Sequence, residues 1–364
     1  VNSNIPSLPT YNVGLSEDVV KQKYGLTDIV KLASNENPYG PSATVRIAIE
    51  HSLDKINIYP DATASELRQL LSDKLQVDAD SIIVGNGSEE LISIAARTFL
   101  NAADEMTTVS PDFGLHAIHT MSMGACVRYI KFNDDFSFNV EGIIDALKKK
   151  PKMLCISSPS NPVGSFLREQ DIKSIARACG DHTVFVFDEA YYEYASTESD
   201  YPDCISILRD SGARFILLRT FSKAYGLAGI RIGYGIANHK DVIEHMHRVR
   251  MPFNVNTIAQ IAAASALNDS SHMNHCCKVA ARDREVVFQA LSKMGLKIAP
   301  STTNFLFVNT NHSANQIAEA LQSRGVIVKP WSSPGYDTFI RISIGTPAEI
   351  EYFLASIEDV LSEV

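Results

Sequence analysis

Short apolar runs recur through the first two thirds of the chain, and each gives way to polar, glycine-rich or proline-rich residues. Runs of this length and composition predict strands that are covered on both faces. Stretches with helical spacing of apolar residues alternate with them, and Ser65–Leu75 shows this spacing just ahead of the first run. This alternation from about residue 82 to residue 236 predicts an α/β fold with a mainly parallel sheet. The runs are Ser81–Val84, Thr107–Ser110, Leu154–Ser158, Thr183–Phe187 and Phe215–Leu218.

The pattern changes after Pro252. An alanine-rich helix and a long polar helix are followed by three strand-like segments on a smaller scale, which is typical of an α+β domain. We therefore expect residues 37–254 to form a large domain, and residues 1–36 and 255–364 to form an N-terminal arm plus a small C-terminal domain. Within the arm, Ser16 followed by two acidic residues predicts the start of a helix that runs to Tyr24.

Length and charge narrow the class of protein. A chain of 364 residues exceeds the usual size of one core, so two domains are expected. The net charge of −9 argues against nucleic acid or an anionic membrane as a partner. Neither a secretory leader nor an apolar run of transmembrane length is visible, which predicts a cytoplasmic protein, although the start of the sequence is open to trimming.

The six cysteines are scattered and show no paired metal-ligand spacing. Most lie in apolar segments, so we expect buried free thiols in a reducing compartment and no metal site. The alternative is a site built from the adjacent Cys276 and Cys277 with nearby histidines, which lacks a second cluster to complete it.

Candidate chemistry follows the strands. Ligands of open α/β sheets bind at the carboxyl ends of the strands, where Gly87, Asn161, Asp188 and Lys223 are expected. A lysine held among apolar neighbours and cations has a lowered pKa, which suits an amine that condenses with an aldehyde. Spacing alone leaves open that Lys223 is an ordinary surface residue at a strand end.

The sequence around this lysine resembles a known family. Ser222-Lys223 followed by Gly226, Ala228-Gly229 and Arg231 resembles the cofactor-lysine signature of fold-type I pyridoxal 5'-phosphate (PLP) aminotransferases. The segment KLASNENPYGPS, residues 31–42, is similar to the opening motif of the histidinol-phosphate aminotransferase branch. The motif matches run from Tyr11 to Gly345 in the family's order.

This resemblance implies the aspartate aminotransferase-like fold, in which a large PLP-binding domain is built around a seven-stranded sheet. It implies that PLP is bound covalently to Lys223, with Asp188 and Tyr191 as further catalytic residues. Asp188 would pair with the pyridinium nitrogen, and Tyr191 would donate a hydrogen bond to the phenolic oxygen. The other cofactor-binding residues it implies are Gly87, Ser88, Glu89, Phe113, Asn161, Thr220, Ser222 and Arg231.

Several of these positions can also be interpreted as purely structural residues. Glycine-rich turns such as the one at Gly87 also occur with nothing bound, and Phe113 is equally compatible with a core position. Tyr59 is a packing aromatic in one reading. In the family, the corresponding tyrosine reaches the phosphate in the partner subunit, which implies a homodimer with shared active sites.

The resemblance assigns the substrate to Tyr11, Asn161, Lys329 and Arg341. Arg341 would form a bidentate clamp on an acidic group, although its alternation with apolar residues also fits a solvent-facing charge. Lys329 stands where this branch usually has an arginine, and a lysine holds a phosphate as a point charge without a planar fork. Trp331 suits an aromatic or imidazole ring if it lines the site, and is otherwise a packing residue.

The function expected from the resemblance is a ping-pong transamination from histidinol phosphate to 2-oxoglutarate in histidine biosynthesis. The partners are then a small amino donor and a 2-oxo acid. An aromatic amino acid aminotransferase is the alternative on the same scaffold. A phospho-amino-acid decarboxylase and a non-catalytic effector module of a transcription regulator are further alternatives, the last disfavoured by the short segment ahead of residue 31.

Overall fold

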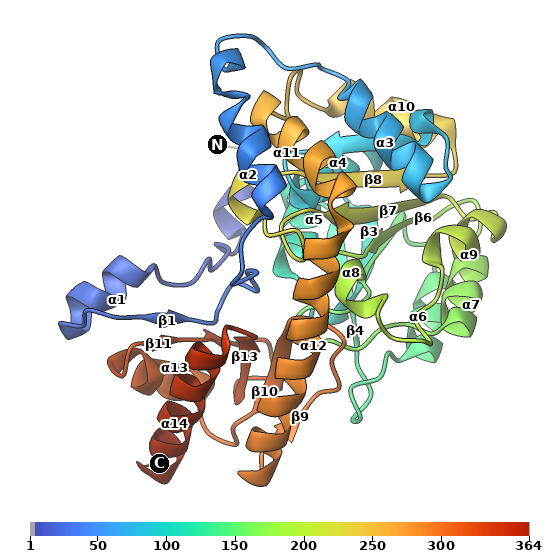
Figure 1. Cartoon of the computed structure of the whole chain (residues 1–364). Helices are drawn as coiled ribbons and strands as arrows, with labels where there is room; N and C mark the ends of the chain where they lie inside the picture. Colours follow the sequence, from blue (N-terminus) through green and yellow to red (C-terminus); the bar gives the residue numbers. More distant parts are fainter. Residues whose placement is uncertain (1–3, 364) are drawn as a thin grey trace.

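The structure, a computed structural model, describes residues 4–363. Its centre is a seven-stranded sheet with the order β2-β8-β7-β6-β5-β3-β4 (Figure 1). Strand β8 is antiparallel to β2 and β7, and the remaining pairs are parallel, so the expected mainly parallel sheet is confirmed. The strands are β2 (Ile82–Gly85), β3 (Glu105–Ser110), β4 (Cys126–Lys131), β5 (Met153–Ser157), β6 (Val184–Asp188), β7 (Phe215–Thr220) and β8 (Gly233–Ala237).

Helices cover both faces of this sheet, which is why its inner strands are apolar throughout. In β5, Leu154 and Ile156 join the core on one face, while Met153 and Cys155 join the core on the other. The second face carries α4 (Ser88–Phe99), α5 (Gly114–Ser122) and α10 (Lys240–Val249). The first carries α2 (Ala43–Glu50), α3 (Ser65–Leu75), α6 (Val140–Leu147), α7 (Glu169–Cys179), α9 (Cys204–Asp210) and α11 (Thr257–Asn268).

A smaller sheet with the order β12-β13-β10-β9 lies beside the long helix α12 (Ser270–Lys293) (Figure 1). It packs with α13 and α14 around a core of its own. Within residues 4–363, no helix has both the length and the apolar character needed to cross a membrane. The remaining elements are β9 (Lys297–Ile298), β10 (Phe305–Asn309), β11 (Val326–Ile327), β12 (Lys329–Pro330), β13 (Phe339–Ser343), α8 (Tyr192–Ala195), α13 (Ala314–Ser323) and α14 (Pro347–Glu363).

The N-terminal segment joins the C-terminal part of the chain. Helix α1 (Glu17–Tyr24) begins where expected, because the Ser16 side chain accepts a hydrogen bond from the Val19 amide. Strand β1 (Val30–Lys31) pairs in parallel with β11, and Figure 1 shows both near α13. We propose on this basis that the arm and the C-terminal residues form one unit. Its boundary at residue 255 stays a prediction, since α11 just beyond it packs on α2 and α3.

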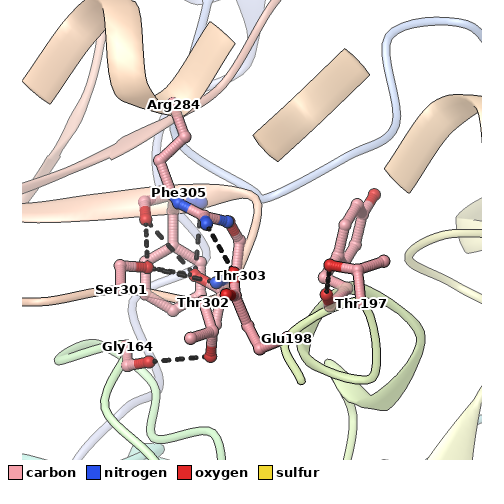
Figure 2. Close-up of polar contacts among 9 residues, drawn as sticks. Gly164, Thr197, Glu198, Arg284, Ser301, Thr302, Thr303 and Phe305 are labelled. Carbon is pink, nitrogen blue, oxygen red and sulfur yellow. Dashed lines mark hydrogen bonds and ion pairs between the residues drawn. The ribbon is translucent and has the colours of Figure 1, made fainter. Parts of the chain in front are cut away.

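One close approach ties the two sheets together next to the strand ends. The Gly164 carbonyl oxygen, three residues after Asn161, accepts a hydrogen bond from the Thr302 amide at 3.2 Å. It also accepts one from the Thr302 hydroxyl at 3.4 Å (Figure 2). Gly164 has a φ of 97°, and a Cβ there would lie 2.5 Å from the Ser301 hydroxyl oxygen. Only glycine fits this position, so the loop that carries Asn161 is fixed against the segment that enters β10.

Candidate active site

The carboxyl ends of the strands of the large sheet open into a cavity of about 270 Å³. With one exception, Tyr59, the site residues predicted from the sequence line this cavity. They come from the large sheet, the N-terminal segment and the small sheet, so the cavity lies where these three parts meet. The residues are Tyr11, Gly87, Ser88, Glu89, Phe113, Asn161, Asp188, Tyr191, Thr220, Ser222, Lys223, Arg231, Lys329 and Arg341.

Lys223 follows strand β7 and extends into the cavity, where its Nζ donates a hydrogen bond to the Ser34 carbonyl oxygen at 3.1 Å. Burial, and after it the positive charge of Arg341, lowers the pKa of Lys223 to about 8. A substantial fraction of the amine is therefore neutral near physiological pH. This is the form that attacks a carbonyl carbon.

An anion-binding cup lies on one side of Lys223. Gly87 precedes α4 with a φ of 81°, and the free amides of the helix N-terminus follow it. A Cβ at Gly87 would lie 2.5 Å from Nη2 of Arg231, so the guanidinium sits directly over this turn. The hydroxyls of Thr220 and Ser222, which are 3.0 Å apart, are also at the cavity wall. Amides, hydroxyls and a guanidinium together suit a phosphate.

Asp188 lies at the end of β6 and is 4% exposed. Its Oδ1 accepts a hydrogen bond from the Ala190 amide at 3.1 Å, and its Oδ2 lies 3.4 Å from Nε2 of His116. Sequence reasoning missed His116 and its second partner, Asp112. The four-residue spacing of Asp112 and His116 is visible in the sequence, but nothing there places them beside Asp188.

Tyr191 is fixed by a residue that sequence reasoning also missed. Asn35 donates a hydrogen bond from Nδ2 to the Tyr191 hydroxyl at 2.8 Å, and its Oδ1 accepts one from Ser343 at 3.0 Å. Burial raises the pKa of Tyr191 to about 12, so the phenol stays protonated and can donate its hydrogen. Asn35 lies in the segment at residues 31–42 that resembles the family's opening motif. That resemblance marked the segment, but it did not indicate the contact between Asn35 and Tyr191.

Arg341 faces the cavity and not the solvent. It is 7% exposed, donates to Asn161 Oδ1 and to the Ala33 carbonyl oxygen, each at 2.6 Å, and leaves its Nε without a partner among the described residues. No carboxylate within residues 4–363 forms an ion pair with it. A buried guanidinium without a counter-charge is costly, which indicates a site for an anionic group.

Lys329 is the direct cross-strand neighbour of Arg341 in the β12–β13 pair. Its ammonium donates to the Asn12 carbonyl oxygen, and the ring of Tyr11 lies 5.9 Å away. Burial and then the charge of Arg341 lower the pKa of Lys329 to about 8. Trp331 does not line the cavity. It packs against Phe307 with ring centroids 5.8 Å apart, as a packing residue does.

The aromatic wall of the cavity contains Phe113, which meets the ring of Tyr11 edge-on at 5.8 Å. Tyr59 lies elsewhere. Its side chain is 79% exposed and stacks on Phe253 at 4.7 Å, so it does not reach the cavity of its own chain. Residues 4–363 contain no group of three or more histidine, cysteine or acidic side chains placed to hold a metal ion.

These features define a cofactor-dependent enzyme of the fold-type I class, and sequence comparison gives the family. The chain belongs to the class I and II aminotransferases, whose family model matches residues 27–357. The fold and family expected from the motifs are thereby confirmed.

Two bacterial relatives match over nearly the full chain. The sequence is 42% identical over 361 residues to histidinol-phosphate aminotransferase 1 of Mesorhizobium japonicum, which covers 99% of this chain and 98% of the relative. It is 41% identical over 360 residues to histidinol-phosphate aminotransferase 3 of Rhizobium meliloti, and the match covers 99% of this chain and 97% of that relative.

Solved structures agree with the fold. Histidinol-phosphate aminotransferase of Sinorhizobium meliloti in complex with pyridoxal 5'-phosphate superposes with a TM-score of 0.92 at 27% identity, covering 100% of this chain and 98% of that one. Aspartate aminotransferase of Thermus thermophilus superposes with a TM-score of 0.85 at 22% identity, covering 100% of this chain and 99% of that one. This match supports the aspartate aminotransferase-like fold.

Proposed function

We propose that the protein transfers the amino group of histidinol phosphate to 2-oxoglutarate, using PLP held covalently by Lys223. The cavity fits this cofactor at three points: the anion-binding cup at Gly87 and Arg231 suits its phosphate, Lys223 its aldehyde, and buried Asp188 its ring nitrogen. When bound, PLP acts as the electron sink that stabilises negative charge on the substrate carbon. The relatives and the Sinorhizobium meliloti structure support the choice of cofactor and substrate.

Lys223 has two tasks in this proposal. Its amine, with a pKa of about 8, would hold the cofactor covalently until the amino donor takes its place. The freed amine would then act as a general base, taking a proton from the donor carbon and, as the ammonium, delivering it to the former aldehyde carbon of the cofactor. Meanwhile Asp188 keeps the ring nitrogen protonated, and the Tyr191 hydroxyl holds the cofactor's phenolic oxygen.

The single observation that carries the choice of substrate is the pairing of Arg341 with Lys329. Like charges directly opposite each other in a sheet are destabilising, and both side chains are at least partly buried at the cavity wall. An anion between them removes this repulsion. The phosphate of histidinol phosphate and the distal carboxylate of 2-oxoglutarate both supply one, so the same pair serves both halves of the reaction.

We expect wild-type protein to use histidinol phosphate with a kcat/KM roughly 10- to 100-fold above that for phenylalanine or tyrosine, because a charge-assisted contact contributes this much. Lys329→Ala should raise KM for histidinol phosphate about tenfold and leave that for phenylalanine nearly unchanged. A coupled assay of glutamate formation from 2-oxoglutarate measures both, and carbon dioxide release from a phosphorylated amino acid is followed in parallel.

Lys148→Ala is the matched control, since Lys148 is 72% exposed and pairs with Asp145 on the surface. Preference for the aromatic donors would contradict the proposed substrate. Equal effects of Lys329→Ala on both donors would remove Lys329 from the phosphate role, and carbon dioxide release would indicate a decarboxylase.

We further propose that the active protein is a homodimer in which Tyr59 contacts the cofactor phosphate of the partner subunit. Tyr59 lines a surface hollow with Ile56 and Ile58 and stacks on Phe253, and these three neighbours are 67%, 64% and 43% exposed. Exposed apolar patches of this kind favour a protein interface. The distance of Tyr59 from its own cavity leaves a second copy as the place where its hydroxyl can act.

Mixing one variant that binds PLP weakly with one that is inactive tests the shared site. Tyr59→Ala should weaken PLP binding about tenfold through loss of one hydrogen bond to a charged group, and Lys223→Ala should be inactive. A hybrid dimer places the intact Tyr59 of one variant beside the intact Lys223 of the other, so one site of wild-type composition forms. Activity of the exchanged mixture above the sum of its components is expected, and its absence would contradict a shared site.

We also propose a cytoplasmic setting. All six cysteines are free, and every one except Cys126 is buried. Unpaired thiols in this number are typical of proteins kept in a reducing compartment.

A further inference from the structure

Glu189 and Arg219 form an ion pair that is shielded from solvent behind the candidate active site. The two residues are 0% and 2% exposed. Nε and Nη2 of Arg219 lie 2.8 Å and 2.7 Å from Oε2 of Glu189. The guanidinium also stacks over the ring of Tyr192, with its Cζ 3.3 Å from the ring centroid. Neither side chain of the pair lines the cavity, so its contacts lie within the fold.

The pair connects the ends of two strands that present candidate catalytic residues. Glu189 directly follows Asp188, which ends β6, and Arg219 directly precedes Thr220, which ends β7. Backbone pairing of β6 with β7 ends at Asp188 and Leu218, and a hydrogen bond from the Glu189 amide to the Leu218 carbonyl oxygen at 2.8 Å extends it. The ion pair therefore joins the two strands where their turns begin.

A tyrosine extends this contact to a third strand end. The Tyr201 hydroxyl lies 2.8 Å from Oε1 of Glu189 and 3.1 Å from the carbonyl oxygen of Ser158, which follows β5. Burial, and after it the charge of Glu189, raises the pKa of Tyr201 well above its usual value, so the hydroxyl keeps its hydrogen and donates it. Ser158 leads into the turn that carries Asn161. The ends of β5, β6 and β7 thus share one buried polar cluster.

Stability alone does not account for such a pair. Fully buried ion pairs rarely stabilise a fold more than apolar residues of the same volume do, because both charges lose their hydration. They do fix geometry, since either charge is costly to leave without its partner. Burial by itself lowers the pKa of Arg219, but the charge of Glu189 outweighs burial and holds this pKa well above its usual value. The guanidinium therefore stays charged and depends on Glu189 as its counter-charge.

We propose that Glu189 and Arg219 are positioning residues, whose ion pair fixes the turn after β6 relative to the turn after β7. The inference rests on the proposed function, in which Asp188 meets the ring nitrogen of PLP and Lys223 its aldehyde. The aromatic ring holds these two parts of PLP at a fixed separation, so the two turns must match it. A shift of one turn against the other would misplace the reacting groups without removing any of them.

Conservative exchanges test the pair in the holoenzyme. Arg219→Lys keeps the charge but loses the planar group that reaches Glu189 with two nitrogens and stacks on Tyr192. We expect kcat to fall about 10- to 100-fold, because misplacement of reacting groups by about 1 Å costs this much. The PLP dissociation constant should rise, and KM for the donor should change little. The visible circular dichroism of bound PLP, which reports the orientation of its ring, should also change.

A double variant separates positioning from stability. Glu189→Gln combined with Arg219→Met removes both charges, so that neither is left buried without a partner, and the melting temperature should stay close to that of the wild type. If the pair positions the turns, kcat and PLP affinity are low in this variant all the same. Wild-type kcat and PLP affinity in the double variant would overturn the proposal, because the pair would then serve stability alone.

Arg128 and Glu105 provide a matched control pair. Nε and Nη2 of Arg128 lie 2.7 Å and 2.6 Å from the carboxylate oxygens of Glu105, and the two residues come from neighbouring strands of the same sheet. Glu105 begins β3, at the end of the strand away from the cavity. Arg128→Lys should leave kcat, PLP affinity and circular dichroism unchanged. The same result for Arg219→Lys would contradict the proposal.

Failure of the proposed function is distinguishable from failure of this inference. It would appear as wild-type protein that binds PLP but lacks transaminase activity. The PLP dissociation constants and the circular dichroism of the Arg219→Lys and double variants would still test the ion pair, since neither measurement requires turnover.

Discussion

Replacing Lys223 by alanine is expected to abolish transamination, with a fall in kcat of at least about 10³-fold, because one side chain supplies both the covalent attachment and the general base. No other amine can substitute easily. Lys329 is the other lysine at the cavity wall, and its ammonium is directed to the Asn12 carbonyl beside Arg341, on the substrate side. Because Lys329 cannot replace it, removal of the Lys223 amine should lower kcat while leaving protein stability little changed.

Two measurements check this expectation together. The visible absorbance of enzyme-bound PLP should disappear from Lys223→Ala after gel filtration, and glutamate formation should fall to background. Far-ultraviolet circular dichroism verifies that the variant is folded, and Lys148→Ala, a surface lysine, provides the matched control. Turnover near the wild-type level would remove Lys223 from its assigned role.

Much of the cavity was predictable because parallel sheets impose a simple geometry. Once the apolar runs are identified as strands, the residues that follow them must meet at one edge. Gly87, Asn161, Asp188 and Lys223 illustrate this, since Asp188 ends a strand, the other three lie in the turns that follow strands, and all four line the same cavity. Helix bounds were predicted well where a cap was visible, as at Ser16.

Contacts between residues far apart in the sequence were not predictable. Nothing in the sequence indicates that Asn35 reaches Tyr191, or that His116 on a helix faces Asp188 on a strand. In the sequence, Arg341 alternates with apolar residues along its strand, and this pattern left open whether its side chain faces solvent. The structure settles this, because the Arg341 side chain is buried at the cavity wall, where it donates to Asn161 Oδ1 and to the Ala33 carbonyl oxygen.

The division of the chain shows a different limit. The change of pattern after Pro252 marks the end of strand–helix alternation, but helix α11 beyond it packs on α2 and α3. Its alanine-rich face allows close helix packing, and composition alone does not tell which sheet such a helix covers. Tertiary packing determines this, and packing is what a local pattern leaves out.

The second large effect is expected for Asp188→Asn. Asparagine keeps the shape of the side chain and its contact with the Ala190 amide, but it removes the charge that holds a protonated ring nitrogen. Preorganised charge at a reacting group contributes about 10²- to 10³-fold to kcat, so a fall of this size is expected. KM for the donor should change little, because the proposed partners of its acidic end are Arg341 and Lys329, not Asp188.

The measurement is kcat and KM for both half-reactions, together with a titration of apo protein with PLP. Asp145→Asn, at a position 71% exposed, serves as the control for the substitution itself. An unchanged kcat would show that the carboxylate does not stabilise the reacting cofactor. A loss of PLP binding without a loss of kcat at saturation would limit Asp188 to holding the cofactor.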